Sequence, residues 1–335
     1  MNFCIYGINY KSVDIASRER YFISNDVSDG ILAKFKELSV LPIVILSTCN
    51  RTEFYFSENS DNFVDVLKSS SHYMIDMKFE KKEKLAAIKH LFKVTSGLES
   101  QILGENEILS QVKNAYYKSL NLGLTNKFFN LLFNRALKVG KDVRSKTKIS
   151  CGNLSFASIV FNKIKRLFGN INNKNILLVG AGVISETILN YFSKNEIKLK
   201  IVSGKHYEKA VNLANIFNTE VIYFDKLKSA ITTSDIIIVA TSAPHFLINK
   251  NCIIKDGKTR IIFDLSVPRN VDPNIKDNKT ILYNIDNLKE ISDSNLQIRK
   301  NAVTEAEKII EGQIEEINKI WKRELELEQG HHHWH

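Results

Sequence analysis

The sequence has few cysteines and no long apolar run, and each absence excludes a class of protein. Its 335 residues include four cysteines, which lie far apart and form no CxxC pair: Cys4, Cys49, Cys151 and Cys252. The paired cysteines of a zinc or redox motif are therefore excluded, and we expect no metal. Apolar runs such as residues 176–179 and 236–240 are far shorter than the roughly 18 residues that span a membrane.

The amino terminus also lacks the features of a secretory signal. MNFCIYGINYKS has no basic start, no long apolar stretch and no small-residue cleavage site. Disulfide bonds are therefore not expected, and we predict a reduced, cytoplasmic protein. With 44% hydrophobic residues the chain can bury proper cores, which excludes a disordered protein. At roughly 150 residues per domain, the length predicts about two domains.

The chain carries an excess of positive charge, but not in one block. Its 47 lysines and arginines outnumber its 37 aspartates and glutamates, which gives a net charge of +10. Such a balance suits a polyanionic partner such as nucleic acid. Because the basic residues are scattered along the chain, solubility alone is the alternative explanation.

The first half predicts an α+β domain, which we place at residues 1–148. Helical periodicity dominates from about residue 61 to 168, and strand-like apolar runs occur near residues 3–8, 43–46 and 52–56. The polar stretch Ser47–Arg51 separates two of these strands. Cys49 is therefore expected on a turn at a strand end, where a rigid scaffold presents a side chain outward.

A different pattern begins near Asn175, where an apolar strand, a glycine turn and a helix follow one another. Strands then alternate with helices, which predicts a doubly wound parallel sheet of the Rossmann type over residues 149–285. A long charged helix is expected over residues 286–327 as a solvated connecting or docking helix, and we interpret residues 328–335 as an affinity tag. The predicted class is thus α/β, with an N-terminal α+β catalytic domain, a Rossmann NADP-binding domain and a long C-terminal connecting helix.

The glycine turn is the strongest local motif. Its first glycine permits a tight turn, and its second lets backbone N–H groups approach a pyrophosphate at the start of the helix. A small serine replaces the usual third glycine. The alternative is a structural turn in another kind of α/β domain. The residues expected to bind the cofactor here are Gly180, Ala181, Gly182, Val183, Ile184 and Ser185.

Residues about twenty positions further on indicate which dinucleotide binds. An acid there would bind the ribose 2′-hydroxyl of NAD, but residues 202–206 read VSGKH and include none. Ser203 and Lys205 would instead suit the 2′-phosphate of NADP(H). The alternative is that Lys205 simply faces solvent, as most lysines do.

Cys49 is a candidate nucleophile with a plausible structural alternative. A lone cysteine is usually a small buried hydrophobic residue. The polar turn and the neighbouring Arg51 nevertheless predict a stabilised thiolate with a lowered pKa.

The other candidate residues also have structural alternatives. His90 lies on an otherwise apolar helix face, where a hydrogen-bonded core histidine is the alternative. Glu105 and Glu107 could serve only the dipole of the following helix, and Gln111 lies one turn beyond Glu107.

Together these segments resemble the glutamyl-tRNA reductase family. The resemblance extends from Gly7 to about Leu288, and the STCNR and GLES…LGE motifs are specific to that family. It rests on GINYKS near the start, STCNRTE at Ser47–Glu53, HLFKVTSGLESQILGENEILSQVK at His90–Lys113, NRALKVGKDVR at Asn134–Arg144, GAGVIS at Gly180, ATSAP at Ala240 and DLSVPRNVDP at Asp264–Pro273.

The resemblance implies an activity and a set of site residues. NADPH would reduce glutamyl-tRNA(Glu) to glutamate-1-semialdehyde through a cysteine thioester and release the tRNA, the first step of five-carbon tetrapyrrole (haem) synthesis. Cys49 would be the nucleophile, and His90 a second catalytic residue. The residues implied around the glutamyl group are Thr48, Asn50, Arg51, Ser100, Glu105, Asn106, Glu107 and Gln111. Arg51 would hold the substrate carboxylate with its planar fork.

The sequence departs from the family pattern at three places. Asn106-Glu107 stands where the family usually has Pro-Gln, and Ser185 where it commonly has glycine. Family members usually continue into a helical domain that forms a homodimer, whereas we expect this native sequence to stop near residue 327. The homodimer is therefore left open, and a downstream aminomutase is a further candidate partner.

Two other functions remain as alternatives. One is a Rossmann dehydrogenase of a small metabolite, which would not depend on charged tRNA. The other is a non-catalytic regulator that binds tRNA or tetrapyrrole. The STCNR motif speaks against the regulator, because a protein that only binds has no need of an activated thiol.

Overall fold

The computed structural model describes residues 2–57, 62–70, 79–150, 155–291 and 296–331. The chain divides into two compact units. One contains Met1–Gly152 together with Asn295–His335, and the other contains Asn153–Ser294. The first unit is therefore built from two separate stretches of chain.

The first unit contains a four-stranded antiparallel sheet. Its strand order is β2 (Ile43–Ser47), β3 (Arg51–Phe56), β1 (Cys4–Asn9) and β4 (Glu80–Glu83). Strands β2 and β3 form a hairpin in which Ser47 lies opposite Thr52. The helices of this part of the unit are α1 (Ile15–Arg20), α2 (Asn25–Glu37), α3 (Phe63–Ser70), α4 (Lys84–Thr95), α5 (Glu107–Asn121) and α6 (Lys127–Lys146).

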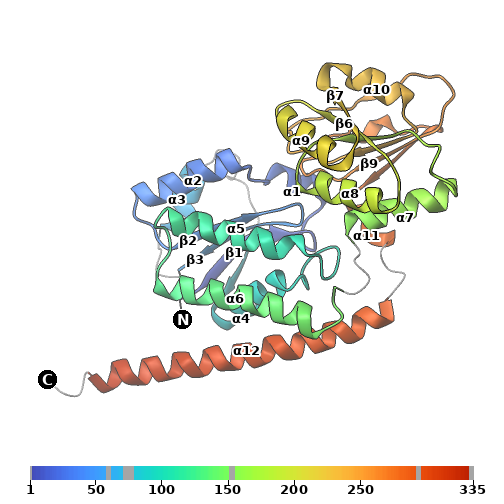
Figure 1. The fold of residues 1–335 in the computed structure, drawn as a ribbon. Helices are drawn as coiled ribbons and strands as arrows, with labels where there is room; N and C mark the ends of the chain where they lie inside the picture. The colour runs from blue at the N-terminus through green and yellow to red at the C-terminus, as the bar shows by residue number, and fades with distance from the viewer. Residues whose placement is uncertain (1, 58–61, 71–78, 151–154, 292–295, 332–335) are drawn as a thin grey trace. The chain divides into compact units, whose positions relative to one another are not determined.

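Helices cover both faces of this sheet (Figure 1). Alternate strand residues enter two separate cores, as the pleat of a β-strand requires. Ile43 and Ile45 pack with α2 and α3, whereas Val44 and Leu46 pack with α4, α5 and α6. Burial on both faces explains why this strand reads as a continuous apolar run rather than an alternating one.

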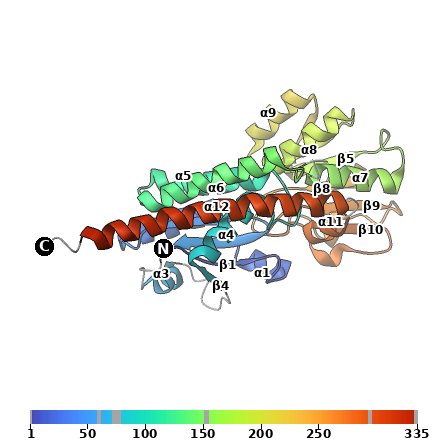
Figure 2. The ribbon, with the colours of Figure 1, turned by 90° about the horizontal axis from the view of Figure 1, so that it is seen from below.

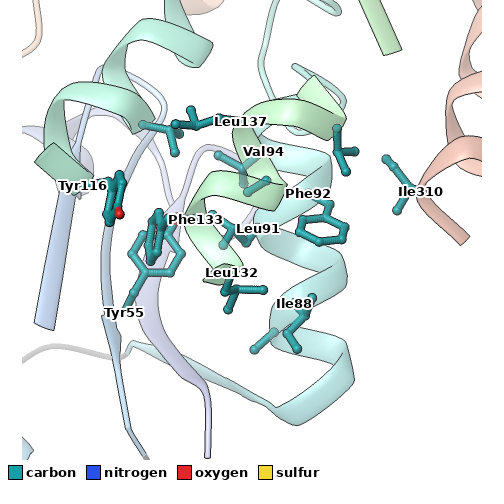
Figure 3. Close-up of a cluster of buried hydrophobic side chains, with 14 of the residues drawn as sticks. Tyr55, Ile88, Leu91, Phe92, Val94, Tyr116, Leu132, Phe133, Leu137 and Ile310 are labelled. Carbon is teal, nitrogen blue, oxygen red and sulfur yellow. The ribbon is translucent and has the colours of Figure 1, made fainter. Parts of the chain in front are cut away.

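The core beneath α4, α5 and α6 is rich in aromatic rings (Figure 3). Phe133 of α6 packs against Tyr55 of β3, with ring centroids 5.5 Å apart, and stacks on Tyr116 of α5 at 5.2 Å. Each such ring buries a large apolar area and adds an edge-to-face or stacking preference. This layer fixes the helices over the sheet that carries Cys49.

The C-terminal helix packs on this unit. The single helix expected from residue 286 corresponds to two described helices, α11 (Ile285–Ile291) and α12 (Leu296–His331). Figures 1 and 2 show α12 running along α4 and α6. Ala302, Ala306 and Ile310 are buried in the shared core, and Figure 3 shows Ile310 pointing toward α4. Of the two roles expected for the long helix, docking therefore describes this stretch, and a solvated connection does not.

Ion pairs border the apolar contact of α12. Lys93 of α4 pairs with Glu307 at 3.0 Å, and Arg135 of α6 pairs with Glu316 at 2.8 Å. These pairs are partly exposed, so each contributes little to stability. The buried alanines and isoleucines account for most of the attachment of α12.

The second unit has the doubly wound sheet that the sequence predicts. Six parallel strands follow the order β10 (Thr280–Asn284), β9 (Arg260–Asp264), β8 (Ile236–Val239), β5 (Ile176–Val179), β6 (Lys200–Ser203) and β7 (Glu220–Tyr223). The order reverses between β5 and β8, and ligands of such sheets bind outside the strand ends at that point. The helices of this unit are α7 (Phe156–Phe168), α8 (Val183–Lys194), α9 (Tyr207–Phe217), α10 (Leu227–Thr233) and α11.

Among the described helices, none combines the length and the apolar character needed to cross a membrane.

Candidate active site

Cys49 lies in the three-residue connection of the β2–β3 hairpin. The backbone N–H of Thr48 donates to the carbonyl of Arg51 at 2.8 Å, and the N–H of Asn50 donates to Thr48 Oγ1 at 3.1 Å. Arg18 of α1, itself buried, donates from Nε to the carbonyl of Cys49 at 3.1 Å. These bonds fix the backbone of the turn and therefore the position from which the Cys49 side chain extends.

The thiol of Cys49 is neutral in the protein alone. Burial raises its pKa to about 12, and the negative charges of Glu105 and Glu107 add to the rise. Arg18 and Arg51 act in the opposite direction but do not outweigh these effects. The prediction of a lowered pKa for the Cys49 thiol is therefore wrong for this structure, although Arg51 acts in the predicted direction. Cys49 is half-buried, so part of the residue is accessible to a reactant.

Arg51 is held by the protein rather than left free. It is 1% exposed, and its Nη1 pairs with Glu53 Oε1 at 3.2 Å while its Nη2 donates to the carbonyl of Glu99. Its Nε has no hydrogen-bond partner within the described chain. A buried donor without a partner costs free energy, which makes this edge of the guanidinium suited to a ligand oxygen.

Glu53 is the centre of a buried polar network. Its Oε1 accepts a hydrogen bond from His90 Nε2 at 2.7 Å, and its Oε2 accepts one from the hydroxyl of Tyr55 at 2.6 Å. Burial alone would raise the pKa of Glu53, but electrostatic interaction with His90 and Arg51, together with these hydrogen bonds, lowers it to about 2. The carboxylate is therefore charged at neutral pH.

Glu105 approaches the Cys49 turn from the loop between α4 and α5. Its Oε1 accepts a hydrogen bond from Asn50 Nδ2 at 3.1 Å, and its carbonyl accepts one from Arg144 Nη2 at 2.8 Å. Burial raises the pKa of Glu105 to about 7; the nearby charge of Glu107 adds to this, and the Ser100 hydroxyl and nearby arginines oppose it. Both protonation states of Glu105 are thus populated near neutral pH.

A glycine allows this loop to close on the unit. Gly104 has a φ of 75°, in the left-handed region that L side chains rarely adopt. A Cβ on Gly104 would also clash with the backbone of Ile149. Because Gly104 immediately precedes Glu105, this close approach helps to place the carboxylate.

The other predicted substrate residues lie on the loop between α4 and α5 and on the first turns of α5. Ser100 is 4% exposed and its carbonyl accepts a hydrogen bond from the Tyr10 hydroxyl at 3.4 Å. Glu107 is close enough for its charge to act on the thiol of Cys49. Asn106 is exposed ahead of α5, and Gln111 is half-buried one turn further along that helix.

The glycine turn of the second unit is shaped for close approach. Gly180 has a φ of 118°, and a Cβ there would clash with the carbonyl oxygen of Ala240 at the end of β8. Around Gly182, no described atom lies within 4 Å of the place that a Cβ would occupy. Helix α8 begins at Val183, which is 71% exposed. Open space before a helix N-terminus fits a phosphate group.

Ser185 replaces the third glycine without opening the structure. Its side chain is fully buried, and its Oγ donates to the carbonyl of Ala240 at 3.3 Å. Ala181 and Ile184 are half-buried beside it. The helix therefore packs closely on the strands, as a dinucleotide-binding turn requires.

The end of β6 carries the residues expected to select the cofactor. Ser203 is 7% exposed at the strand end, and Lys205 is exposed in the following loop. Tyr207 and Tyr223 stack nearby, with ring centroids 4.2 Å apart. Within the described residues, no group of three or more His, Cys, Asp or Glu side chains could hold a metal.

Comparison with known proteins separates the two units. Residues 6–147 match the model of the glutamyl-tRNAGlu reductase N-terminal domain, and residues 162–291 match that of shikimate/quinate 5-dehydrogenase. A glutamyl-tRNA reductase of Methanococcus maripaludis (strain C7) is 39% identical over 284 residues, which cover 82% of this chain and 72% of that protein. The chain belongs to the glutamyl-tRNA reductase family.

Other members of the glutamyl-tRNA reductase family agree. One from Methanobrevibacter smithii is 32% identical over 318 residues, covering 94% of this chain and 78% of that protein. The solved structure of glutamyl-tRNA reductase from Methanopyrus kandleri superposes with a TM-score of 0.55 at 28% identity, covering 96% of this chain and 81% of that one. The predicted family, the oxidoreductase class and the fold class are thereby confirmed.

Sequence reasoning missed several residues of the site in this glutamyl-tRNA reductase family member. Arg18 donates a hydrogen bond to the carbonyl of Cys49, and Arg144 donates one to the carbonyl of Glu105. Glu53 contacts both Arg51 and His90. A signal for Glu53 was present, because Arg51, Glu53 and Tyr55 alternate along β3 and so share one face. Arg18 and Arg144 left no such signal, since only the fold brings their helices to the turn.

Proposed function

We propose that this chain uses NADPH to reduce glutamyl-tRNA(Glu) to glutamate-1-semialdehyde and releases the tRNA, the first step of tetrapyrrole synthesis. One observation carries the proposal: Cys49 is fixed on a turn whose neighbours Arg51 and Glu105 are both buried and ionisable. Membership of the family supports it, since the named relatives are called glutamyl-tRNA reductases.

The polar groups around the thiol match a glutamyl group. Arg51 Nε is left to bind the side-chain carboxylate, while the rest of the guanidinium is held by Glu53 and the Glu99 carbonyl. Asn50 Oδ1, which has no partner in the described part of the chain, and Glu105 are acceptors for the α-ammonium group. The same set would discriminate against glutamine, which lacks the negative charge.

Cys49 then takes the glutamyl group. The sulfur attacks the ester carbonyl carbon, the new C–S bond forms, and the C–O bond to the tRNA ribose breaks. The thiol proton must leave first, and Glu105, with a pKa of about 7, is suited to accept it and to return it to the departing ribose oxygen. We assign Glu53 and His90 to positioning Arg51 rather than to contact with the reacting atoms.

The residues of the second unit fit a nicotinamide dinucleotide. Gly180 to Ser185 would hold the pyrophosphate at the start of α8, and Ser203 and Lys205 would hold a ribose 2′-phosphate. When bound, NADPH supplies the hydride that converts the thioester to a hemithioacetal. That intermediate forms as an oxyanion, and its collapse breaks the C–S bond; the aldehyde leaves, and the Cys49 sulfur takes up a proton from water to regenerate the thiol.

The end of α6 offers a surface for the tRNA. Arg144 binds the carbonyl of Glu105, so this end of the helix lies at the site, and Lys138, Lys141 and Lys148 are exposed there. Lysines on an accessible face suit contacts with nucleic-acid phosphates. The homodimer, the downstream aminomutase and the cytoplasmic location remain predictions.

The proposal is tested by isolating the acyl-enzyme. The full chain is mixed with glutamyl-tRNA in the absence of NADPH, and intact-protein mass spectrometry is used to look for a glutamyl adduct on Cys49. The adduct should form in the wild type and in the control Cys252→Ser, and be absent from Cys49→Ser. NADPH should then release glutamate-1-semialdehyde. Turnover of a small metabolite without charged tRNA would favour a plain dehydrogenase instead.

A further inference from the structure

Asn270 is a fully buried polar residue in the loop after β9 for which the proposed chemistry gives no role. Its Oδ1 accepts a hydrogen bond from the Thr241 hydroxyl at 2.5 Å. Its Nδ2 donates to the carbonyls of Ala243 and His245, at 2.8 and 3.0 Å. One side chain therefore holds both ends of the segment 241–245, which follows strand β8.

The backbone of Asn270 is fixed as firmly as its side chain. Asp264, at the end of β9, accepts hydrogen bonds at Oδ2 from the N–H groups of Asn270 and Val271, both at 2.9 Å. The carbonyl of Asn270 accepts from Leu247 N at 2.7 Å and from Ile248 N at 3.0 Å. Buried groups that satisfy every polar atom specify a single conformation.

The held segment lies at the point where the strand order reverses. It continues from β8, which pairs directly with β5, the strand that leads into the glycine turn. Ala240, which immediately precedes the segment, is in contact with that turn through Ser185 Oγ. A dinucleotide crosses such a sheet at this point, with its two halves on opposite sides.

The two halves can be assigned from the residues at each strand end. The β6 side carries Ser203 and Lys205, which suit the adenosine end with its 2′-phosphate. The nicotinamide end then falls on the side of β8 and β9, where the segment 241–245 begins. Ser242 and Pro244 of that segment are exposed, so it presents a surface to a ligand while Asn270 stays beneath it.

We propose that Asn270 is a positioning residue for the nicotinamide half of the cofactor, acting through the segment 241–245 that it clamps. The inference rests on the proposed use of NADPH. Asn270 itself is fully buried, so it acts through the exposed segment above it. Without its amide, Thr241 and two carbonyls lose their partners, and the segment gains conformations that binding must then remove.

The experiment compares two ligands on the same variants. Asn270→Ala removes the clamp, and Thr241→Val removes the hydroxyl that Asn270 accepts from, while Thr241→Ser keeps it. Asn274→Ala changes an exposed asparagine four residues away and serves as the matched control. NADPH binding is followed by the fluorescence of the reduced nicotinamide ring. Binding of adenosine 2′,5′-bisphosphate, which contains only the adenosine end, is followed by calorimetry.

We expect the variants to lose affinity for NADPH but not for adenosine 2′,5′-bisphosphate. Asn270→Ala and Thr241→Val should weaken NADPH binding by about tenfold, as expected for one or two lost hydrogen bonds, and should shift the nicotinamide emission. Adenosine 2′,5′-bisphosphate should bind these variants as it binds the wild type, and Thr241→Ser should restore NADPH binding. Equal losses for both ligands, or unchanged NADPH binding and emission in folded Thr241→Val, would overturn the proposal.

This outcome is separable from that of the proposed function. Formation of the glutamyl adduct on Cys49 needs no NADPH and is measured separately. Absence of the adduct would reject the reductase mechanism without altering the cofactor titrations. A normal adduct together with equal ligand losses would reject only the role of Asn270.

Discussion

The ring Nε2 of His90 donates a hydrogen bond to Glu53 Oε1 at 2.7 Å, and this oxygen also pairs with Arg51 Nη1 at 3.2 Å. One buried carboxylate oxygen therefore accepts hydrogen bonds from two side chains, one on α4 and one on β3. Because Glu53 and Arg51 lie on the same face of β3, the strand itself sets their spacing. The orientation of Arg51 beside Cys49 thus depends, through Glu53, on His90 of α4.

Glu53→Gln should be strongly destabilising. The amide leaves Arg51 and His90 buried without a negative partner, and breaking a buried pair in this way costs about 3–5 kcal/mol. Since the pKa of Glu53 is lowered to about 2, its stabilising contribution is present above its usual pKa and is lost as the pH falls toward 2. Urea unfolding at pH 7 and pH 4 measures both effects. The control Glu80→Gln, at an exposed position of strand β4, should change little, and a wild-type-like Glu53→Gln would contradict the network.

Cys49 should react slowly with alkylating agents in the free protein. A pKa of about 12 leaves so little thiolate at pH 8 that alkylation by iodoacetamide should be at least about a hundredfold slower than for an ordinary thiol. The rate should keep rising above pH 9. Peptide-resolved mass spectrometry follows Cys49 and Cys252 in the same sample. Rapid alkylation of Cys49 at pH 7 would show that its thiol is already activated.

Glu105→Gln should remove a pH-dependent loss of stability. The pKa of Glu105 is raised from 4.5 to about 7, so the folded protein keeps a proton that the unfolded chain releases between these values. Stability therefore falls as the pH rises through that window, and glutamine cannot show this fall. Thermal melts from pH 4 to 8 test the difference between variant and wild type. Cysteine acylation should also slow in the variant, because its proton acceptor is gone.

Arg51→Lys should keep the charge but lose the geometry. An ammonium group cannot hold Glu53 and the Glu99 carbonyl in one plane while still presenting a further donor. We expect the KM for glutamyl-tRNA to rise by at least about tenfold, with far-ultraviolet circular dichroism unchanged. Steady-state kinetics with a folded variant decide the point: an unaltered KM would remove Arg51 from substrate recognition.

Lys205→Glu should distinguish the two nicotinamide cofactors. A negative charge at this exposed position would repel a ribose 2′-phosphate, so the Kd for NADPH should rise by about tenfold or more while that for NADH changes little. Lys209→Glu on the exposed side of α9 controls for net charge. Equal changes for NADPH and NADH in fluorescence titrations would contradict the assignment of Lys205.

The sequence carries enough information for the elements that have strong periodicity. The apolar run Ile43–Leu46, the polar turn at Cys49 and the helices around His90 and Glu107 follow from residue spacing alone. Strand β4 does not, because its sequence, EKKE, contains no apolar residue. It exists through backbone pairing with β1, in which Cys4 lies opposite Glu83, and that pairing leaves no mark on the side chains.

The sequence predicted which residues belong to the site better than it predicted their protonation and their partners. Arg51 is two residues from Cys49, which suggested an activated thiolate. The structure places both of its terminal nitrogens on other partners, and burial then governs the pKa of Cys49. Proximity in sequence cannot reveal the partner of a guanidinium, because that choice depends on Glu53 and on the loop that carries Glu99.

Because α12 completes the core of the first unit, that unit cannot finish folding until the end of the chain has been made. A ribosome makes residues 153–294 after the first sheet and before the helix that covers it. The second unit can thus fold before Ala302, Ala306 and Ile310 have been made and packed against the apolar side chains of α4 and α6. Until α12 has been made, the apolar faces of α4 and α6 that it covers therefore stay exposed to water.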